Sequence, residues 1–255
     1  MSLLFWIILF SLLGGVLSVI AASTFLLFKD SVRDRLIPHF VSFAIGALLG
    51  AAFLALLPHA VDGVKDFHEL GMTVLLGILI FFLLEKMVIW RHCHAHDCEA
   101  HGEHDVIQTS GMLVLIGDGL HNFVDGILIA SAFLTDFHLG VVTSLAVAAH
   151  EIPQEVGDFA VLLHSGFSRI KAFIFNIIAS LTTIVGAVIA YYSLEDATHI
   201  QPFVLAVAAS SFIYIAVADL IPGLHQRAKF TETLQQMIMI LAGVIVIYMA
   251  HSTLH

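Results

Sequence analysis

Charged side chains are scarce in this sequence, since Asp, Glu, Lys and Arg together make up only 12% of its 255 residues. Hydrophobic residues account for 59%, and the mean hydropathy is strongly positive, outside the range of soluble globular domains. The five prolines and 18 glycines fall mostly within apolar runs, so no linker divides the chain. The composition predicts one integral membrane domain over residues 1–255, in contact with a lipid bilayer and with no nucleic-acid partner.

The apolar residues form runs of about 20 residues, the length that crosses a hydrocarbon core of about 30 Å. The first run is too long for the core of a signal peptide, so we expect it to remain as the first span. Hydropathy predicts an all-α bundle of eight transmembrane helices. The predicted spans are residues 3–28, 37–61, 70–90, 111–135, 139–165, 170–193, 201–224 and 233–251.

Positive charge is also scarce, and it is unevenly distributed between the predicted loops. Nine of the ten basic residues lie on alternate loops, and only Lys65 lies on the others. The nine are Lys29, Arg33, Arg35, Lys86, Arg91, Arg169, Lys171, Arg227 and Lys229. Basic residues in short loops collect on the cytoplasmic side, so both termini are predicted to be extracytoplasmic. This multi-pass plan with short loops suits a prokaryotic inner (cell) membrane, although an organelle membrane protein would look much the same.

Acidic residues lie inside the predicted spans without basic partners. An Asp at the centre of a membrane helix costs about 2.5 to 3.5 kcal/mol on insertion scales, so such residues normally face a cavity or the bundle interior. A bound cation could neutralise two or three of them at once. Protonation is the alternative, and Asp118 and Asp219, near span ends, could instead be solvated. The six residues are Asp118, Asp125, Glu151, Glu155, Asp158 and Asp219.

The spacing of these polar residues places them on helical faces. In "GDGLHNFVDG", four polar residues follow i, i+3, i+4 and i+7, which puts them on one side of the fourth predicted span. These residues are Asp118, His121, Asn122 and Asp125. In "AVAAHEIPQEVGDFAVLLHS" the fifth span carries a similar stripe, composed of His150, Glu151, Gln154, Glu155 and Asp158.

Imidazole, carboxylate and amide groups together suit zinc, iron(II), manganese or cobalt. A lone His or Asn in a membrane helix is more often a hydrogen-bond partner between helices than a ligand, but that reading does not account for the whole cluster. Pro153 removes one backbone hydrogen bond and frees the carbonyl of Ala149, which could help to bind a cation or could merely shape packing.

The stretches "HNFVDG" at 121–126 and "HEIPQEVGDF" at 150–159 resemble the paired signature of the ZIP family of divalent metal transporters. The resemblance extends over the whole chain. It implies a binuclear site between spans 4 and 5 that moves zinc, and often iron, manganese or cadmium, towards the cytoplasm. It also implies an elevator-like movement, commonly within a homodimer.

Carried over by position, the resemblance implies two groups of ligands. His121, Asp125, His150 and Gln154 would form the primary transport site. Asn122, Asp125, Glu151 and Glu155 would form or border the second, with Asp125 bridging. Further contributions are implied from span 2, by His59 and Asp62, and from span 6, by Asn176.

A histidine-rich segment, "HCHAHDCEAHGEH", lies within the loop predicted at 92–110. It contains the only two cysteines of the chain, and reducing conditions on the predicted cytoplasmic side argue against a disulfide. We interpret the segment as a metal buffer or sensor, and an inert polar linker is the alternative. Its candidate ligands are His92, Cys93, His94, His96, Cys98, His101 and His104.

Two other functions have to be weighed against transport. "HEIPQ" resembles the HExxH motif of zinc proteases, but Gln154 stands where the second His is required, so we do not expect an enzyme. A channel-like pathway for metal ions or protons is a nearer alternative that the sequence does not distinguish from a carrier.

Overall fold

The computed structural model describes residues 2–94, 103–225 and 229–254, with the backbone alone at 88–94, 103–110 and 254. The described residues are helical and contain no strand. The helices are α1 (Leu3–Gly14), α2 (Val16–Phe25), α3 (Asp30–Ala51), α4 (Leu57–Asp62), α5 (Phe67–His94), α6 (Glu103–Thr135), α7 (Phe137–His164), α8 (Arg169–Ser180), α9 (Thr182–Leu194), α10 (Gln201–Tyr214), α11 (Ile221–His225) and α12 (Phe230–Leu254). Two π-helical segments, η1 (Ala52–Leu56) and η3 (Ile215–Leu220), and a 3-10 turn, η2 (Thr198–Ile200), join some of them.

Seven helical segments among the described residues are long and apolar enough to cross a membrane. They correspond to predicted spans 1 to 4 and 6 to 8, and consecutive helices such as α1 and α2 combine into one span. The segments are Leu3–Phe25, Asp30–Asp62, Phe67–Met87, Gly111–Thr135, Arg169–Leu194, Thr198–His225 and Phe230–Thr253. Helix α7, at the position of the fifth span, has 28 residues, but its polar stripe lowers its hydropathy. The all-α membrane fold is therefore confirmed, whereas the count of eight spans stays a prediction.

The helices extend further than hydropathy indicates near the histidine-rich segment. Helix α5 continues to His94, and α6 begins at Glu103 rather than near 111. Residues 103–110, expected in a loop, are therefore helical. Hydropathy measures lipid compatibility, whereas a helix continues as long as its backbone hydrogen bonds form, so a polar sequence can extend a span beyond the membrane. His96, Cys98 and His101 lie outside the described residues.

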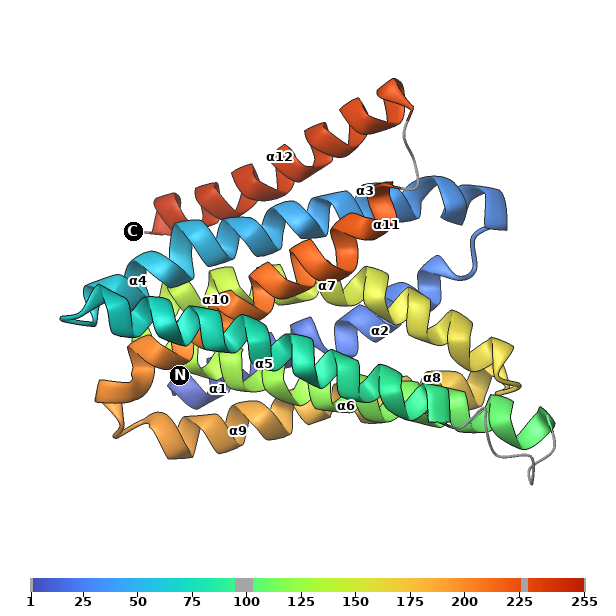
Figure 1. The fold of residues 1–255 in the computed structure, drawn as a ribbon, viewed down its shortest axis with the longest axis horizontal. Helices are drawn as coiled ribbons and strands as arrows, with labels where there is room; N and C mark the ends of the chain where they lie inside the picture. Colours follow the sequence, from blue (N-terminus) through green and yellow to red (C-terminus); the bar gives the residue numbers. More distant parts are fainter. Residues whose placement is uncertain (1, 95–102, 226–228, 255) are drawn as a thin grey trace.

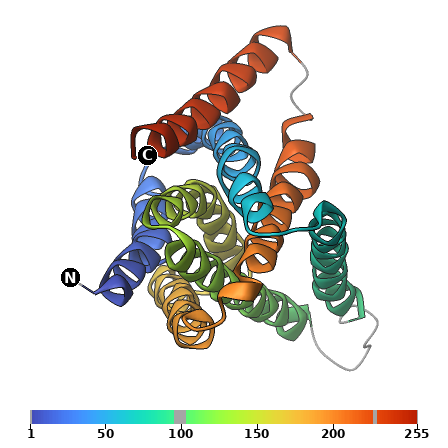
Figure 2. The ribbon, with the colours of Figure 1, turned by 90° about the vertical axis from the view of Figure 1, so that its left-hand side faces the viewer.

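Helix α7 lies at the centre of the bundle. Viewed end-on in Figure 2, it is surrounded by other helices, and it packs against α1, α2, α3, α6, α8 and α12. Helices α5 and α12 lie at the periphery, with only 11% of their most apolar stretches buried. A helix that carries carboxylates is thus kept away from lipid by its neighbours, which is the arrangement that polar residues at membrane depth require.

Helices α6 and α9 cross with their backbones in contact, because each has a glycine at the crossing. A Cβ atom at Gly126 would lie 1.9 Å from the carbonyl oxygen of Thr183, and one at Gly186 would lie 2.0 Å from that of Phe123. Small residues allow this close approach in membrane bundles. The crossing brings Thr183 of α9 within hydrogen-bonding distance of Asn122 on α6.

Replacing Gly186 with Ala should therefore lower the apparent melting temperature of the purified protein. The added methyl group meets backbone rather than a flexible side chain, and overpacking of this kind typically costs about 1–3 kcal/mol. Gly71→Ala is the matched control, because no heavy atom lies within 4 Å of a Cβ at that position. Equal melting temperatures for the two variants would contradict the close crossing.

The two ends of the bundle differ in which helix ends they contain. In Figure 1 the right-hand end contains the C-terminal ends of α2, α5, α7 and α11 and the N-terminal ends of α3, α6, α8 and α12. The N-terminal and C-terminal ends of the chain lie at the left-hand end, with α4. The predicted basic loops all connect helix ends at the right, and Lys65 follows α4 at the left. The predicted basic loops thus join helices at one end of the bundle. That this end faces the cytoplasm stays a prediction.

Candidate metal centre

A tight turn sets the relative position of the two polar stripes. Helix α6 ends at Thr135 and α7 begins at Phe137, so Asp136 alone separates them. The Asp136 carboxylate caps α7 by accepting hydrogen bonds from the backbone N–H groups of His138 and Leu139, at 2.8 and 2.9 Å. The number of residues between Asp125 and Asp136 is similar to the number between Asp136 and His150. Because both helices rise by about 1.5 Å per residue, the two stripes lie at the same depth.

Four side chains converge from these stripes to form the first group of potential ligands. The Nε2 atom of His121 lies 3.2 Å from Nε2 of His150, 3.3 Å from Oε1 of Glu151 and 3.7 Å from Oδ2 of Asp125. His150 Nε2 lies 3.4 Å from the same Asp125 oxygen and 3.6 Å from the Glu151 oxygen.

These separations match the edges of a tetrahedral metal site. With ligands about 2.0–2.1 Å from zinc, the ligand atoms of a tetrahedron are separated by roughly 3.3–3.4 Å. Two imidazole nitrogens and two carboxylate oxygens therefore have the spacing that a divalent ion of zinc's size requires, and they would need little movement to bind it.

His150 is already oriented for metal binding. Its Nδ1 lies 3.1 Å from the backbone carbonyl oxygen of Ala146, one helical turn earlier. Because a carbonyl oxygen can only accept, Nδ1 carries the proton, and the lone pair is on Nε2. Nε2 is the atom that faces His121 and Asp125. The backbone of α7 thus fixes both the tautomer and the direction of the ring.

Three carboxylates form a second group beside the first. One oxygen from each of Asp118, Glu151 and Glu155 lies within 4.8 Å of the others. Glu151 belongs to both groups, whereas the sequence resemblance assigns the bridging role to Asp125 and leaves Asp118 outside the primary ligands. In the described structure, Glu151 is the shared residue and Asp118 takes a place in the second group.

Asn122 lies beside the second group and is held in place by its own helix, α6, and by α9. Its amide nitrogen donates to a carboxylate oxygen of Asp118 at 2.8 Å, and its amide oxygen accepts from the hydroxyl of Thr183 on α9 at 2.7 Å. Sequence reasoning missed Thr183. A threonine in an apolar run is a weak signal, and its role depends on α9 packing against α6.

The cluster is buried and short of hydrogen bonds. Asp125, Glu151 and Glu155 are at most 1% exposed, and among the described residues their carboxylate oxygens accept no hydrogen bond. The imidazoles of His121 and His150 lie at ion-pair distance from Asp125 and Glu151. Buried anions without a partner are costly, so such groups are normally paired or coordinate a metal. The side chain of His121 is 24% exposed, and it is the most accessible member of the first group.

The other predicted residues differ in how deeply they are buried. Asn176 on α8 is fully buried, and neither of its side-chain polar atoms has a hydrogen-bond partner among the described residues. Gln154 and Asp158 are partly buried on α7, and Asp219 is exposed within η3. His59 and Asp62, on α4, belong to neither of the two ligand groups.

Helix α7 continues through Pro153 without a break, from Phe137 to His164. The expected opening of the backbone near Ala149 is therefore limited to the one hydrogen bond that proline cannot make. The ligand groups are built from side chains on two regular helices.

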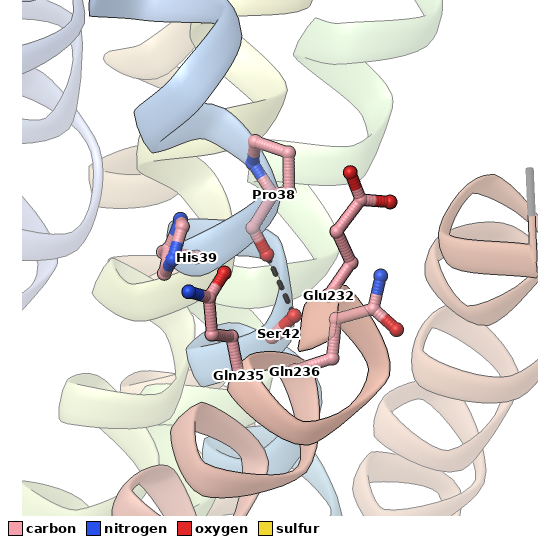
Figure 3. Close-up of a pocket in the computed structure, with 6 residues that line it drawn as sticks. All are labelled: Pro38, His39, Ser42, Glu232, Gln235 and Gln236. Carbon is pink, nitrogen blue, oxygen red and sulfur yellow. Dashed lines mark hydrogen bonds between the residues drawn. The ribbon is translucent and has the colours of Figure 1, made fainter. Parts of the chain in front are cut away.

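A small polar pocket lies elsewhere in the bundle, between α3 and α12 (Figure 3). On the α3 side of this pocket, Ser42 donates a hydrogen bond to the carbonyl oxygen of Pro38, one helical turn earlier, at 2.6 Å. The lining residues are Pro38, His39, Ser42, Glu232, Gln235 and Gln236. Within the described part of the chain, the two groups on α6 and α7 are the clusters of three or more metal-ligating residues, and this pocket contains none.

Comparison with known proteins agrees with this architecture. The profile of the ZIP Zinc transporter family matches residues 1–250. Zinc transporter ZIP13 of Pongo abelii is 34% identical over 81% of this chain and 64% of its own length. Zinc transporter zipt-7.2 of Caenorhabditis elegans is 31% identical over 93% of this chain and also 64% of its own length. The chain thus spans less than two thirds of the length of these relatives. The chain belongs to the ZIP zinc transporter family.

Proposed function

We propose that this protein transports divalent metal cations, zinc foremost, into the cytoplasm through a binuclear site between α6 and α7. The observation that carries the proposal is the buried cluster of imidazoles and carboxylates, spaced for tetrahedral coordination and lacking other partners. Burying three carboxylates beside one another costs free energy that packing alone does not offset, so a bound cation is the simplest reason for a membrane protein to keep them together. Both relatives named above are zinc transporters, which supports this proposal.

The chemistry of the ligands suits a transported ion better than a permanent one. Carboxylates and imidazoles bind zinc, but without thiolate they release it more readily than a structural cysteine site. His121, partly exposed, would meet the ion first, and the sealed Asp125, His150 and Glu151 would complete its coordination. Glu151 would then be shared with a second ion held by Asp118 and Glu155.

The surrounding residues take supporting roles in the proposal. Asn122 would orient Asp118, and Asn176, whose amide has no partner among the described residues, would supply a neutral ligand or bind the ion's water. Gln154 remains a candidate ligand of the primary site.

The proposal also includes the direction of transport, the cargo, the assembly, the membrane and the mode of transport. The family resemblance supports the inward direction, and the basic loops favour a cytoplasmic right-hand end in Figure 1. The family resemblance supports iron, manganese and cadmium as further cargo and a homodimer as the assembly. The short loops support an inner (cell) membrane. A transporter with one set of metal ligands becomes saturated as the metal concentration rises, and this favours a carrier over a channel.

Zinc uptake into proteoliposomes that contain the purified protein tests the proposal. We expect saturable uptake, reduced at least about tenfold by His121→Ala or Glu155→Ala, because loss even of groups around a metal ligand typically costs 10–100-fold. Glu69→Gln, a change at an exposed carboxylate on α5, should leave uptake unchanged.

Two results would contradict this account. Wild-type uptake in both His121→Ala and Glu155→Ala would exclude the site, and absence of zinc flux in the unmodified protein would exclude the function. Uptake that rises linearly with zinc concentration, without saturation, would favour the channel alternative.

A further inference from the structure

A second pair of histidines lies outside the α6–α7 cluster. His59 on α4 and His251 on α12 face each other with ring centroids 5.5 Å apart and an interplanar angle of 72°. In the central cluster, His121 and His150 have centroids 5.4 Å apart at 87°, and their Nε2 atoms are 3.2 Å apart. The two pairs thus have nearly the same separation and a similar edge-to-face arrangement.

His59 is oriented in the same way as the central His150. Its Nδ1 lies 2.9 Å from the backbone carbonyl oxygen of Ala55, four residues earlier in the chain. The carbonyl accepts, so Nδ1 is the protonated nitrogen, and the metal-binding lone pair is on Nε2. Both rings are partly buried, which leaves them within reach of an ion in solution.

The pair lies at the left-hand end of the bundle in Figure 1, where both α4 and the C-terminal end of α12 are found. Two exposed carboxylates, Asp62 at the end of α4 and Asp66 in the α4–α5 connection, lie on either side of one basic residue, Lys65. The opposite end carries most of the basic residues. A surface with this sign of charge raises the local concentration of cations and speeds their arrival.

We propose that His59 and His251 form a separate metal site that captures a divalent cation at this end of the bundle. Two imidazole nitrogens favour an ion of borderline softness such as zinc, and water would complete its coordination. Two protein ligands hold the ion weakly, so it can be passed on. The capture role rests on the transport function proposed above, whereas the binding itself does not.

Site-resolved histidine modification tests the binding. Diethyl pyrocarbonate acylates imidazole nitrogens, and mass spectrometry reports its reaction with each histidine of the full chain separately. We expect zinc to protect His59 and His251 together, with one midpoint concentration. His199, exposed at the same end of the bundle, should remain unprotected.

His59→Phe separates binding from packing, because it keeps an aromatic ring beside His251 and removes the nitrogen ligand. The zinc concentration that protects His251 should rise at least about tenfold in this variant, since even outer-shell losses at metal sites cost that much. Absence of zinc protection at both residues, or an unchanged midpoint for His251 in His59→Phe, would overturn the site.

The uptake assay tests the capture role independently. In His59→Phe and His251→Phe, the zinc concentration for half-maximal uptake should rise about threefold or more with the maximal rate unchanged, as expected when only initial binding is lost. The double variant should be no worse than either single variant. An unchanged half-maximal concentration would refute capture. Zinc protection in a protein without zinc flux would support the site and refute the transport function, so the two failures are distinguishable.

Discussion

Replacing Glu151 with Gln should abolish zinc uptake more completely than any other single change in the cluster. Glu151 is the residue whose oxygens belong to both ligand groups, so its loss weakens two bound ions at once. His121→Ala and Glu155→Ala each remove a ligand from one group. We expect Glu151→Gln to lower the initial rate of uptake by roughly 100-fold or more, the upper end of the range for losses at metal sites.

Double variants sharpen this expectation. If Glu151 bridges two ions, adding His121→Ala or Glu155→Ala to Glu151→Gln should cause little further loss, because residues that act as a unit are strongly non-additive. Initial rates in proteoliposomes, corrected for the amount of folded protein, provide the measurement. A Glu151→Gln variant more active than His121→Ala would contradict the shared role.

Replacing Glu155 with Gln should raise the melting temperature of the metal-free protein. Glu155 is fully buried beside Asp118 and Glu151, and neither of its carboxylate oxygens has a hydrogen-bond donor among the described residues. The amide has the same shape, carries no charge and can donate to the neighbouring Asp118 and Glu151 carboxylates, so the variant should gain about 1–3 kcal/mol, the usual cost of leaving a buried polar group without a partner.

The same variant should respond less to zinc. A ligand that binds only the folded state at 100 times its dissociation constant adds about 2.7 kcal/mol of stability, and loss of a ligand reduces this gain. Thermal unfolding in a chelator and in excess zinc would measure both effects. Glu69→Gln should change neither melting temperature. A Glu155→Gln protein that is less stable without metal would indicate that this carboxylate has a structural role instead.

The stripes on α6 and α7 could be predicted because their spacing is local. Residues at i, i+3, i+4 and i+7 share a helical face whatever the rest of the chain does, so the sequence alone puts Asp118 to Asp125 on one face of α6 and His150 to Glu155 on one face of α7. That the two faces meet is implied by the family resemblance. The one-residue turn at Asp136 then keeps the stripes level, and the two ligand groups follow from side-chain geometry.

Contacts between distant helices could not be predicted in the same way. Thr183 reaches Asn122 because Gly126 and Gly186 let α6 and α9 touch, and nothing in the spacing of either helix indicates which partner it will have. The pairing of His59 with His251 joins helices from opposite ends of the chain. The role of Glu151 as the shared ligand likewise depends on side-chain directions that the sequence pattern leaves open.

The most direct test of the binuclear site is an anomalous difference map recorded at the zinc absorption edge from crystals of the full chain grown with zinc. The account predicts two peaks between α6 and α7, one among His121, Asp125, His150 and Glu151 and the other among Asp118, Glu151 and Glu155. Zinc peaks found elsewhere on the protein, with none between these two helices, would contradict it.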